Sequence, residues 1–268
     1  MIDLEMINDE IEEIGEYIKE DDYDAAYEII EEVLIKTKGM FVENEAERFF
    51  CFDSPIQFYL YDMKLSSQKY IKRSGVDFRT LYLTKGHIDL AYERFEECEE
   101  ALKNALYWNP VDPNIFYELA RLFVQTKDEN KLGIVLKAVR SYILDKISYS
   151  KYYAYLGEYY LLKEDYKTSL ALFYVSESIL ETKIAKDGIQ NILNKAEILN
   201  TPVTEEIIET LKKDGFYFSL DNEVLSMIYD LSYELSKNLN NKSAMYCLDV
   251  LYELTGDEKY LREKEYLE

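Results

Sequence analysis

The chain has 268 residues, and its 53 acidic and 31 basic side chains give a formal net charge of −22. Such a charge repels phosphates, which argues against general nucleic-acid binding, and it suits either a basic partner or simple solubility. Apolar residues make up 48% of the sequence, while nine glycines and four prolines are few for a fold with many tight turns. We therefore expect a folded, all-α protein.

The beginning of the chain and its cysteines point to the cytoplasm. The first segment is acidic and lacks the basic and apolar regions of a signal peptide. No apolar run approaches the roughly 18 residues that a membrane span requires. Cys51, Cys98 and Cys247 are odd in number and widely spaced, as in proteins with buried, reduced thiols. We expect a cytoplasmic protein without a membrane segment.

Residues 1–75 are expected to form irregular helices with one degenerate repeat. The segment EDDYDAAYEIIEEVL is typical of the second helix of a hairpin, and its inward face would carry Ala26, Ile30 and Val33. A further helix is predicted in DSPIQFYLYDMK, which opens with Asp53 or Ser54 as the N-cap and a proline in the first turn.

A basic cluster stands out against the acidic background of this region. It consists of Lys64, Lys69, Lys72 and Arg73. Such a cluster could dock an acidic peptide, a phosphate group or a nucleic acid. It could equally offset neighbouring acidic helices and stabilise the C-terminus of a helix, where cations are favoured, and this second interpretation is the one we prefer.

Residues 76–182 repeat one pattern of large and small side chains. In each copy, the first helix has a small residue flanked by large ones at helical spacing. The second helix has one small and one large residue. The small residues allow the two antiparallel helices to approach closely. Gly86, Ala120 and Gly157 are the small residues of the three first helices, and they are 34 and 37 residues apart. The large and small residues of the clearest copy are Tyr153, Leu156, Gly157, Tyr160, Ser169 and Phe173.

Residues 183–268 are expected to hold connecting helices and a last helix pair. The segment NTPVTEEIIETLKKDG predicts a helix that Thr201 and Pro202 open and Gly215 ends. The final pair has Ser232 on its first helix and Ala244 on its second. Because no low-complexity linker separates the three parts, we expect one continuous domain over residues 1–268.

The repeated pattern resembles the tetratricopeptide (TPR) repeat, W-x2-L-G-x2-Y followed by A-x3-F, with tyrosine in the tryptophan position. The order of the segments FDSPIQFYLY, GHIDLAYERFEECEEALKNALYWNPVDP and YELTGDE is also similar to that of an uncharacterised family of bacterial TPR proteins. This resemblance covers about residues 10–260. It implies a right-handed α-solenoid of antiparallel helix pairs and no known activity. Cys98, Leu132 and Ser169 replace the alanines of the usual repeat, which affects the expected helix spacing.

No motif for catalysis or for a cofactor is present. The sequence lacks CxxC, HExxH, GxxxxGK[ST] and GxGxxG, so neither a metal nor a nucleotide cofactor is indicated. His87 is the only histidine and has no nucleophile at a recognisable spacing. Pairs of acidic residues are abundant but are typical of solvated helix faces. We therefore predict a protein that is not an enzyme and has no catalytic residue, cofactor or metal.

A binding surface is expected on the first helices of the pairs, which line the concave side of a solenoid. Tyrosines offer a large contact area at a small cost in conformational entropy, although they also suit packing against the next repeat. The expected peptide-binding residues are His87, Tyr117, Glu118, Arg121, Tyr155, Glu158, Tyr229, Asp230 and Tyr233.

These observations favour a non-enzymatic scaffold or adaptor that binds a protein or peptide in its concave groove. A basic or hydrophobic segment fits better than an acidic one, because Arg121 is the only basic side chain among the expected positions. Two other functions stay open. One is a regulatory protein that senses a small ligand or a peptide. The other is an enzyme with a site around His87, between the N-terminal helices and the repeats.

Overall fold

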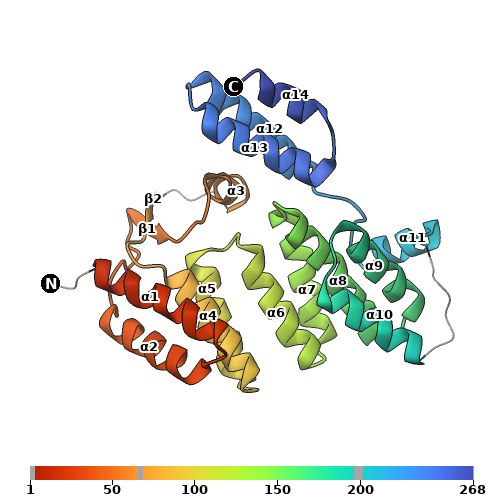
Figure 1. The fold of residues 1–268 in the computed structure, drawn as a ribbon, viewed down its shortest axis with the longest axis horizontal. Helices are drawn as coiled ribbons and strands as arrows, with labels where there is room; N and C mark the ends of the chain where they lie inside the picture. The colour runs from red at the N-terminus through yellow and green to blue at the C-terminus, as the bar shows by residue number, and fades with distance from the viewer. Residues whose placement is uncertain (1–3, 66–68, 196–201, 268) are drawn as a thin grey trace. The chain divides into compact units, whose positions relative to one another are not determined.

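The computed structural model describes residues 4–65, 69–195 and 202–267. The chain is mostly helical (73%), and in the described residues 14 helices pack in sequential pairs beside one small parallel sheet (Figure 1). The helical class predicted from the sequence is confirmed, but the two-stranded sheet was not predicted. None of the described helices is both long enough and apolar enough to cross a membrane. The chain divides into two compact units, Met1–Leu122 and Phe123–Glu268.

The first unit holds two helix hairpins and a β-α-β segment. The helices α1 and α2 pair with each other, α4 pairs with α5, and α2 also contacts α4. The last helix of the unit, α6, runs across its boundary. The elements are α1 (Leu4–Lys19), α2 (Tyr23–Lys36), β1 (Glu47–Phe50), α3 (Pro55–Leu65), β2 (Tyr70–Arg73), α4 (Phe78–Ala91), α5 (Phe95–Trp108) and α6 (Pro113–Gln125).

The second unit contains the remaining helices. The pairs α8–α9 and α12–α13 are packed closely, α10 covers both α8 and α9, and α14 packs on α13. The elements are α7 (Glu129–Val139), a 3-10 turn (Arg140–Tyr142), α8 (Lys146–Leu162), α9 (Tyr166–Ile179), α10 (Lys183–Lys195), α11 (Glu205–Lys213), α12 (Asn222–Lys237), α13 (Asn241–Thr255) and α14 (Lys259–Glu265).

Helix boundaries follow the capping chemistry. The helix α3 begins at Pro55, as the sequence predicts. The predicted start of α11 is wrong: Thr204 caps this helix by accepting a hydrogen bond from the N–H of Ile207, and Thr201 lies outside the described residues. The predicted end at Gly215 is confirmed, because this glycine has a φ of +80° directly after the last turn.

Five helix-to-helix corners in the described residues share one backbone conformation. At each corner a residue other than glycine has a φ between 56° and 61°, and its N–H group bonds the carbonyl three residues earlier. The next residue donates its N–H to the carbonyl five residues earlier and is itself the N-cap of the second helix, so carbonyls at the helix end are satisfied. The left-handed residues are Asp21, Glu93, Lys127, Glu164 and Leu239.

The corners are spaced along the chain with a regular period. Glu93 and Lys127 are 34 residues apart, and Lys127 and Glu164 are 37 residues apart. The two remaining intervals, from Asp21 to Glu93 and from Glu164 to Leu239, are 72 and 75 residues, about twice as long. The first long interval contains the β-α-β segment, and the second contains α10 and α11. The hairpins thus recur at a period close to the one seen in the sequence.

Small residues bring the paired helices together. A Cβ atom on Gly86 would lie 2.7 Å from Leu102, and one on Gly157 would lie 2.6 Å from Phe173. The Ser169 hydroxyl, which replaces an alanine of the usual repeat, donates a hydrogen bond of 2.7 Å to the carbonyl oxygen of Gly157. The predicted close approach of helices at these glycines is therefore confirmed.

The first hairpin has the inward face that the sequence predicts. The three expected side chains are completely buried in a core that α1 and α4 help to form. They are Ala26, Ile30 and Val33.

Candidate functional site

Three of the expected binding residues meet on the first unit. His87 comes from α4, and Glu118 and Arg121 come from α6. A guanidinium nitrogen of Arg121 lies 3.1 Å from His87 Nδ1 and 3.2 Å from a carboxylate oxygen of Glu118. That carboxylate oxygen lies 3.5 Å from His87 Nδ1, and the Tyr23 ring meets the imidazole edge to face. All three side chains are partly exposed, between 25% and 40%, so this polar cluster is accessible to a partner.

Two of the expected tyrosines are buried. Tyr117 is 2% exposed and Tyr155 is 5% exposed, which favours a packing role for both rings. Glu158, on the same helix as Tyr155, is only partly exposed, and burial together with the nearby carboxylate of Asp187 raises its pKa to about 7.

The expected residues of the second unit's α12 are exposed. Tyr229 is 39% exposed and Tyr233 is 58% exposed, and Asp230 lies between them on the surface. The Tyr229 hydroxyl donates to Glu263 of α14 over 3.2 Å, and the ammonium group of Lys237 lies 4.1 Å from the centre of the Tyr233 ring.

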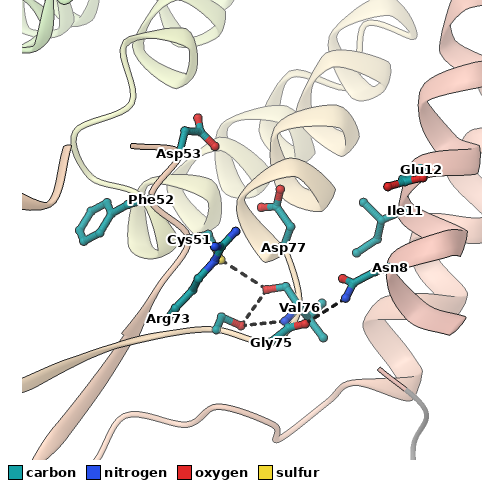
Figure 2. A pocket seen from close by; sticks show the side chains of 11 residues that line it. Asn8, Ile11, Glu12, Cys51, Phe52, Asp53, Arg73, Gly75, Val76 and Asp77 are labelled. Carbon is teal, nitrogen blue, oxygen red and sulfur yellow. Dashed lines mark hydrogen bonds between the residues drawn. The ribbon is translucent and has the colours of Figure 1, made fainter. Parts of the chain in front are cut away.

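A cavity that the sequence did not predict lies in the first unit (Figure 2). Its volume is about 500 Å³, and it lies between α1 and the segments that follow the two strands. We call it the polar cavity. It is lined by Asn8, Ile11, Glu12, Cys51, Phe52, Asp53, Arg73, Ser74, Gly75, Val76 and Asp77.

The parallel sheet accounts for the position of the polar cavity. Glu47 lies opposite Tyr70, and Phe50 lies opposite Arg73, so both strands end at the same edge. The chain leaves that edge through residues 51–53 and 74–77, which form much of the cavity wall. Carboxyl edges of parallel strands are a common place for ligands, because the backbone diverges there and leaves space between the connections.

The segment after β2 is fixed by several hydrogen bonds. Asn8 on α1 donates its amide N–H to the carbonyl of Gly75 over 3.4 Å. The Ser74 hydroxyl and the Cys51 thiol both donate to the carbonyl of Val76, over 2.7 and 3.4 Å (Figure 2). A side chain at Gly75 would collide with Phe41, since a Cβ atom would lie 2.8 Å from its ring. The cavity wall is therefore held from three sides.

A partly buried arginine pairs with carboxylates at the polar cavity. Arg79, whose side chain is 15% exposed, forms ion pairs of 2.5 Å with Asp53 and 3.1 Å with the fully buried Asp112. Asp77 lies 3.9 Å away and caps α4 by accepting from the N–H of Thr80. Burial raises the pKa of Asp53, and Arg79 acts in the opposite direction. Arg79 is therefore already committed to these aspartates.

Two opposite charges on the walls of the polar cavity have no such partner. Arg73 extends from the end of β2, and Glu12 lies on α1 on the other side of the cavity (Figure 2). Within the described residues neither side chain forms an ion pair or a hydrogen bond. With Asp53 and Asp77, the polar cavity carries more negative than positive charge.

A second cavity adjoins the polar one. Its volume is about 290 Å³, and we call it the apolar cavity because five of its lining residues are Phe50, Phe52, Pro55, Phe58 and Ile71. Phe52, Asp53 and Arg73 line both cavities, so a ligand held at Arg73 has an apolar surface within reach.

The basic cluster seen in the sequence is divided by the fold. Tyr70–Arg73 is a strand and not the C-terminus of a helix, although Lys64 does lie in the last turn of α3. Lys69 pairs with Glu43 at 2.7 Å, and Lys72 pairs with Glu47 at 2.5 Å. These pairs fit the preferred interpretation, in which the cluster offsets neighbouring acids, while Arg73 faces the cavities.

The polar cavity shows no arrangement suited to metal binding or thiol chemistry. In the described part of the chain, no three His, Cys, Asp or Glu side chains are placed to hold a metal ion together. Burial raises the pKa of Cys51 to about 11, so its thiol stays protonated at neutral pH. The lining residues can form ion pairs, hydrogen bonds and apolar contacts with a ligand.

Comparisons of the chain with protein-family models, curated proteins and solved structures found no match.

Proposed function

We propose that this chain is a TPR-like right-handed α-solenoid and works as a non-enzymatic scaffold or adaptor that binds a protein or peptide. The observation that carries the proposal is the recurrence of one corner conformation at Glu93, Lys127 and Glu164, at intervals of 34 and 37 residues. Equal corners give successive hairpins equal geometry, and stacked hairpins of this kind present their first helices on one concave face.

The proposed binding face consists of residues on the first helices of the hairpins. His87 on α4 and Glu118 and Arg121 on α6 belong to the first helices of two successive hairpins, and they touch one another at 3.1 to 3.5 Å. Tyr229, Asp230 and Tyr233 are the corresponding residues of α12. Partly exposed carboxylates and phenol rings suit a partner segment that is basic or hydrophobic.

A peptide experiment tests the proposal. Fluorescence anisotropy would compare a peptide of alternating lysine and leucine with a matched peptide in which glutamate replaces each lysine. The lysine peptide is expected to bind more tightly, and its binding to weaken as salt is added. The variant Glu118→Lys on α6 should lower its affinity by roughly threefold to tenfold.

The matched control is Glu97→Lys, which makes the same change at an exposed residue of α5, a second helix. It should bind the lysine peptide as the unmodified protein does. Equal binding of both peptides, or equal effects of the two variants, would remove the support for this face.

The second candidate is a regulatory protein that senses a small ligand. It is favoured by one specific observation, the polar cavity of about 500 Å³ in the first unit, whose size is in the range of small-molecule sites.

A further inference from the structure

We infer that the polar cavity binds a free α-amino acid with an apolar side chain. This inference goes beyond the proposed scaffold function, because it concerns a different set of residues and a different class of ligand, and it gives the second candidate function, the small-ligand sensor, a specific ligand. It depends on three features of the first unit: unpaired opposite charges, an adjoining apolar cavity, and a wall built from backbone at the end of the sheet.

The charges define the two ends of the ligand. Arg73 forms no ion pair within the described residues, and its planar guanidinium suits a carboxylate, to which it can donate two parallel hydrogen bonds. Glu12, on the opposite wall, is likewise unpaired and is the natural acceptor for an ammonium group (Figure 2). A zwitterion carries the two charges that complement these side chains.

The other carboxylates favour the same ligand. Asp53 and Asp77 are held by Arg79 and by the first turn of α4, but they still add negative charge to the polar cavity. An ammonium group is attracted by this excess, whereas a phosphate or another multiply charged anion is repelled. Among the described residues that line the polar cavity, Arg73 is the only cationic side chain, so it offers one carboxylate site.

The apolar cavity defines the side chain of the ligand. It shares Phe52, Asp53 and Arg73 with the polar cavity, so it begins where the bound carboxylate would lie. The rings of Phe52 and Phe58 approach each other edge to face with centroids 6.4 Å apart. Apolar or aromatic side chains gain free energy by leaving water for such a surface. A ligand such as phenylalanine or leucine therefore fits better than glycine or a charged amino acid.

The N-terminal residue of a peptide has the same ammonium group and side chain but no free carboxylate beside them. It would leave Arg73 without a partner, so the free amino acid is the ligand that the cavity favours. Amidation of the amino acid distinguishes these two sources of the same chemistry.

Isothermal titration calorimetry on the full chain tests the inference with three probes of the same size. They are L-phenylalanine, L-phenylalaninamide, which lacks the carboxylate, and 3-phenylpropanoate, which lacks the ammonium group. Phenylalanine is expected to bind, and each analogue to bind at least about tenfold more weakly, because each leaves one charged side chain unpaired.

Two charge-removing variants then assign the ends of the ligand. Arg73→Gln should weaken phenylalanine binding by about tenfold and leave phenylalaninamide unaffected, and Glu12→Gln should weaken phenylalanine similarly and leave 3-phenylpropanoate unaffected. Both residues are exposed, so the variants should fold, which unchanged circular dichroism would show. The control is Lys103→Gln, which removes a charge from the exposed surface of α5.

The inference is overturned if neither phenylalanine nor leucine binds at millimolar concentration. It is also overturned if phenylalaninamide binds as tightly as phenylalanine, or if Arg73→Gln and Glu12→Gln behave like Lys103→Gln. None of these outcomes bears on the peptide experiment, which depends on Glu118, so failure here and failure of the proposed function are separable.

Discussion

The backbone of Gly157 in α8 lies directly against the ring of Phe173 in α9. A Cβ atom at Gly157 would be 2.6 Å from Cδ1 of that ring, and Gly188 of α10 approaches the same ring. One phenylalanine thus fills the space between three helices, and it can do so only because two of them contribute a glycine. Gly86 and Leu102 have the same separation in sequence and the same contact in the first unit.

Replacing Gly157 with alanine should destabilise the protein by about 1–3 kcal/mol, since the added methyl group forces Phe173 or the helix to move. The free energy of unfolding in urea measures this change. Gly15→Ala in α1 is the matched control: nothing lies within 4 Å of its position, and there alanine should stabilise the helix by about 0.5–1 kcal/mol. A loss of stability at Gly15 as large as at Gly157 would contradict the packing argument.

The corner at Glu164 should respond to backbone preference. Its φ of 61° is unfavourable for a side-chain-bearing residue, so Glu164→Gly is expected to raise the free energy of unfolding by roughly 0.5–1 kcal/mol. Glu164→Val should lower it by a similar amount, because a branched Cβ disfavours this conformation further. Thermal and urea unfolding of the two variants provide the measurement, and the opposite order of stability would refute the assignment of this corner.

Glu158 should make stability depend on pH. Burial and the nearby carboxylate of Asp187 raise its pKa to about 7, while Lys195 acts in the opposite direction. Because the folded state holds this proton more tightly than the unfolded state, the contribution of Glu158 to stability is lost as pH rises from about 4.5 to about 7. Glu158→Gln should therefore stabilise the protein by about 2–3 kcal/mol at pH 8 and have little effect at pH 4.

Urea unfolding of this variant across the pH range checks the sign and the window. Glu164→Gln, at an exposed residue of the same hairpin, serves as the control. It should change the free energy of unfolding by the same small amount at pH 4 and at pH 8. If Glu158→Gln also shows a constant difference, Glu158 is not the titrating group.

The cysteines should be unreactive while the protein is folded. Cys51, Cys98 and Cys247 are at most 7% exposed, and burial raises the pKa of their thiols to about 11, 12 and 11. Since the thiolate is the reactive form, a chromogenic disulfide reagent at pH 8 should label none of them within minutes. In concentrated urea it should label all three. Rapid labelling of one cysteine without denaturant would show that its surroundings open.

Local patterns were enough to predict much of the helical architecture. The pattern of small and large residues predicted the close helix contacts at Gly86 and Gly157, each of which meets a side chain of the next helix. The inward face of α2 at Ala26 and Ile30 followed from helical periodicity. Both depend on residues less than 20 positions apart, and such spacings are set by the helix itself.

The same periodicity could not assign the exposed face of α8. Ten of its 17 residues are buried, among them Tyr152, Tyr153 and Tyr155 on different sides of the helix, because neighbouring helices surround it. A helix covered in this way has no single polar face. The sequence pattern therefore could not show whether Tyr155 faces a groove or the core. Glu158 is a second example on the same helix. Its charge suggested an exposed side chain, whereas burial raises its pKa.

The sequence by itself determined the helical class, the period of the hairpins and the glycine contacts, since each of these depends on short-range stereochemistry. Tertiary structure decided the parallel sheet and the polar cavity. The wall of that cavity consists of residues of α1 and of the residues that follow Phe50 and Arg73. The long-range pairing of β1 with β2 places the ends of the two strands at one edge of the sheet. Strands of four residues carry too little local pattern to predict such pairing, because the free energy that stabilises them comes from the partner strand and the helices packed around it.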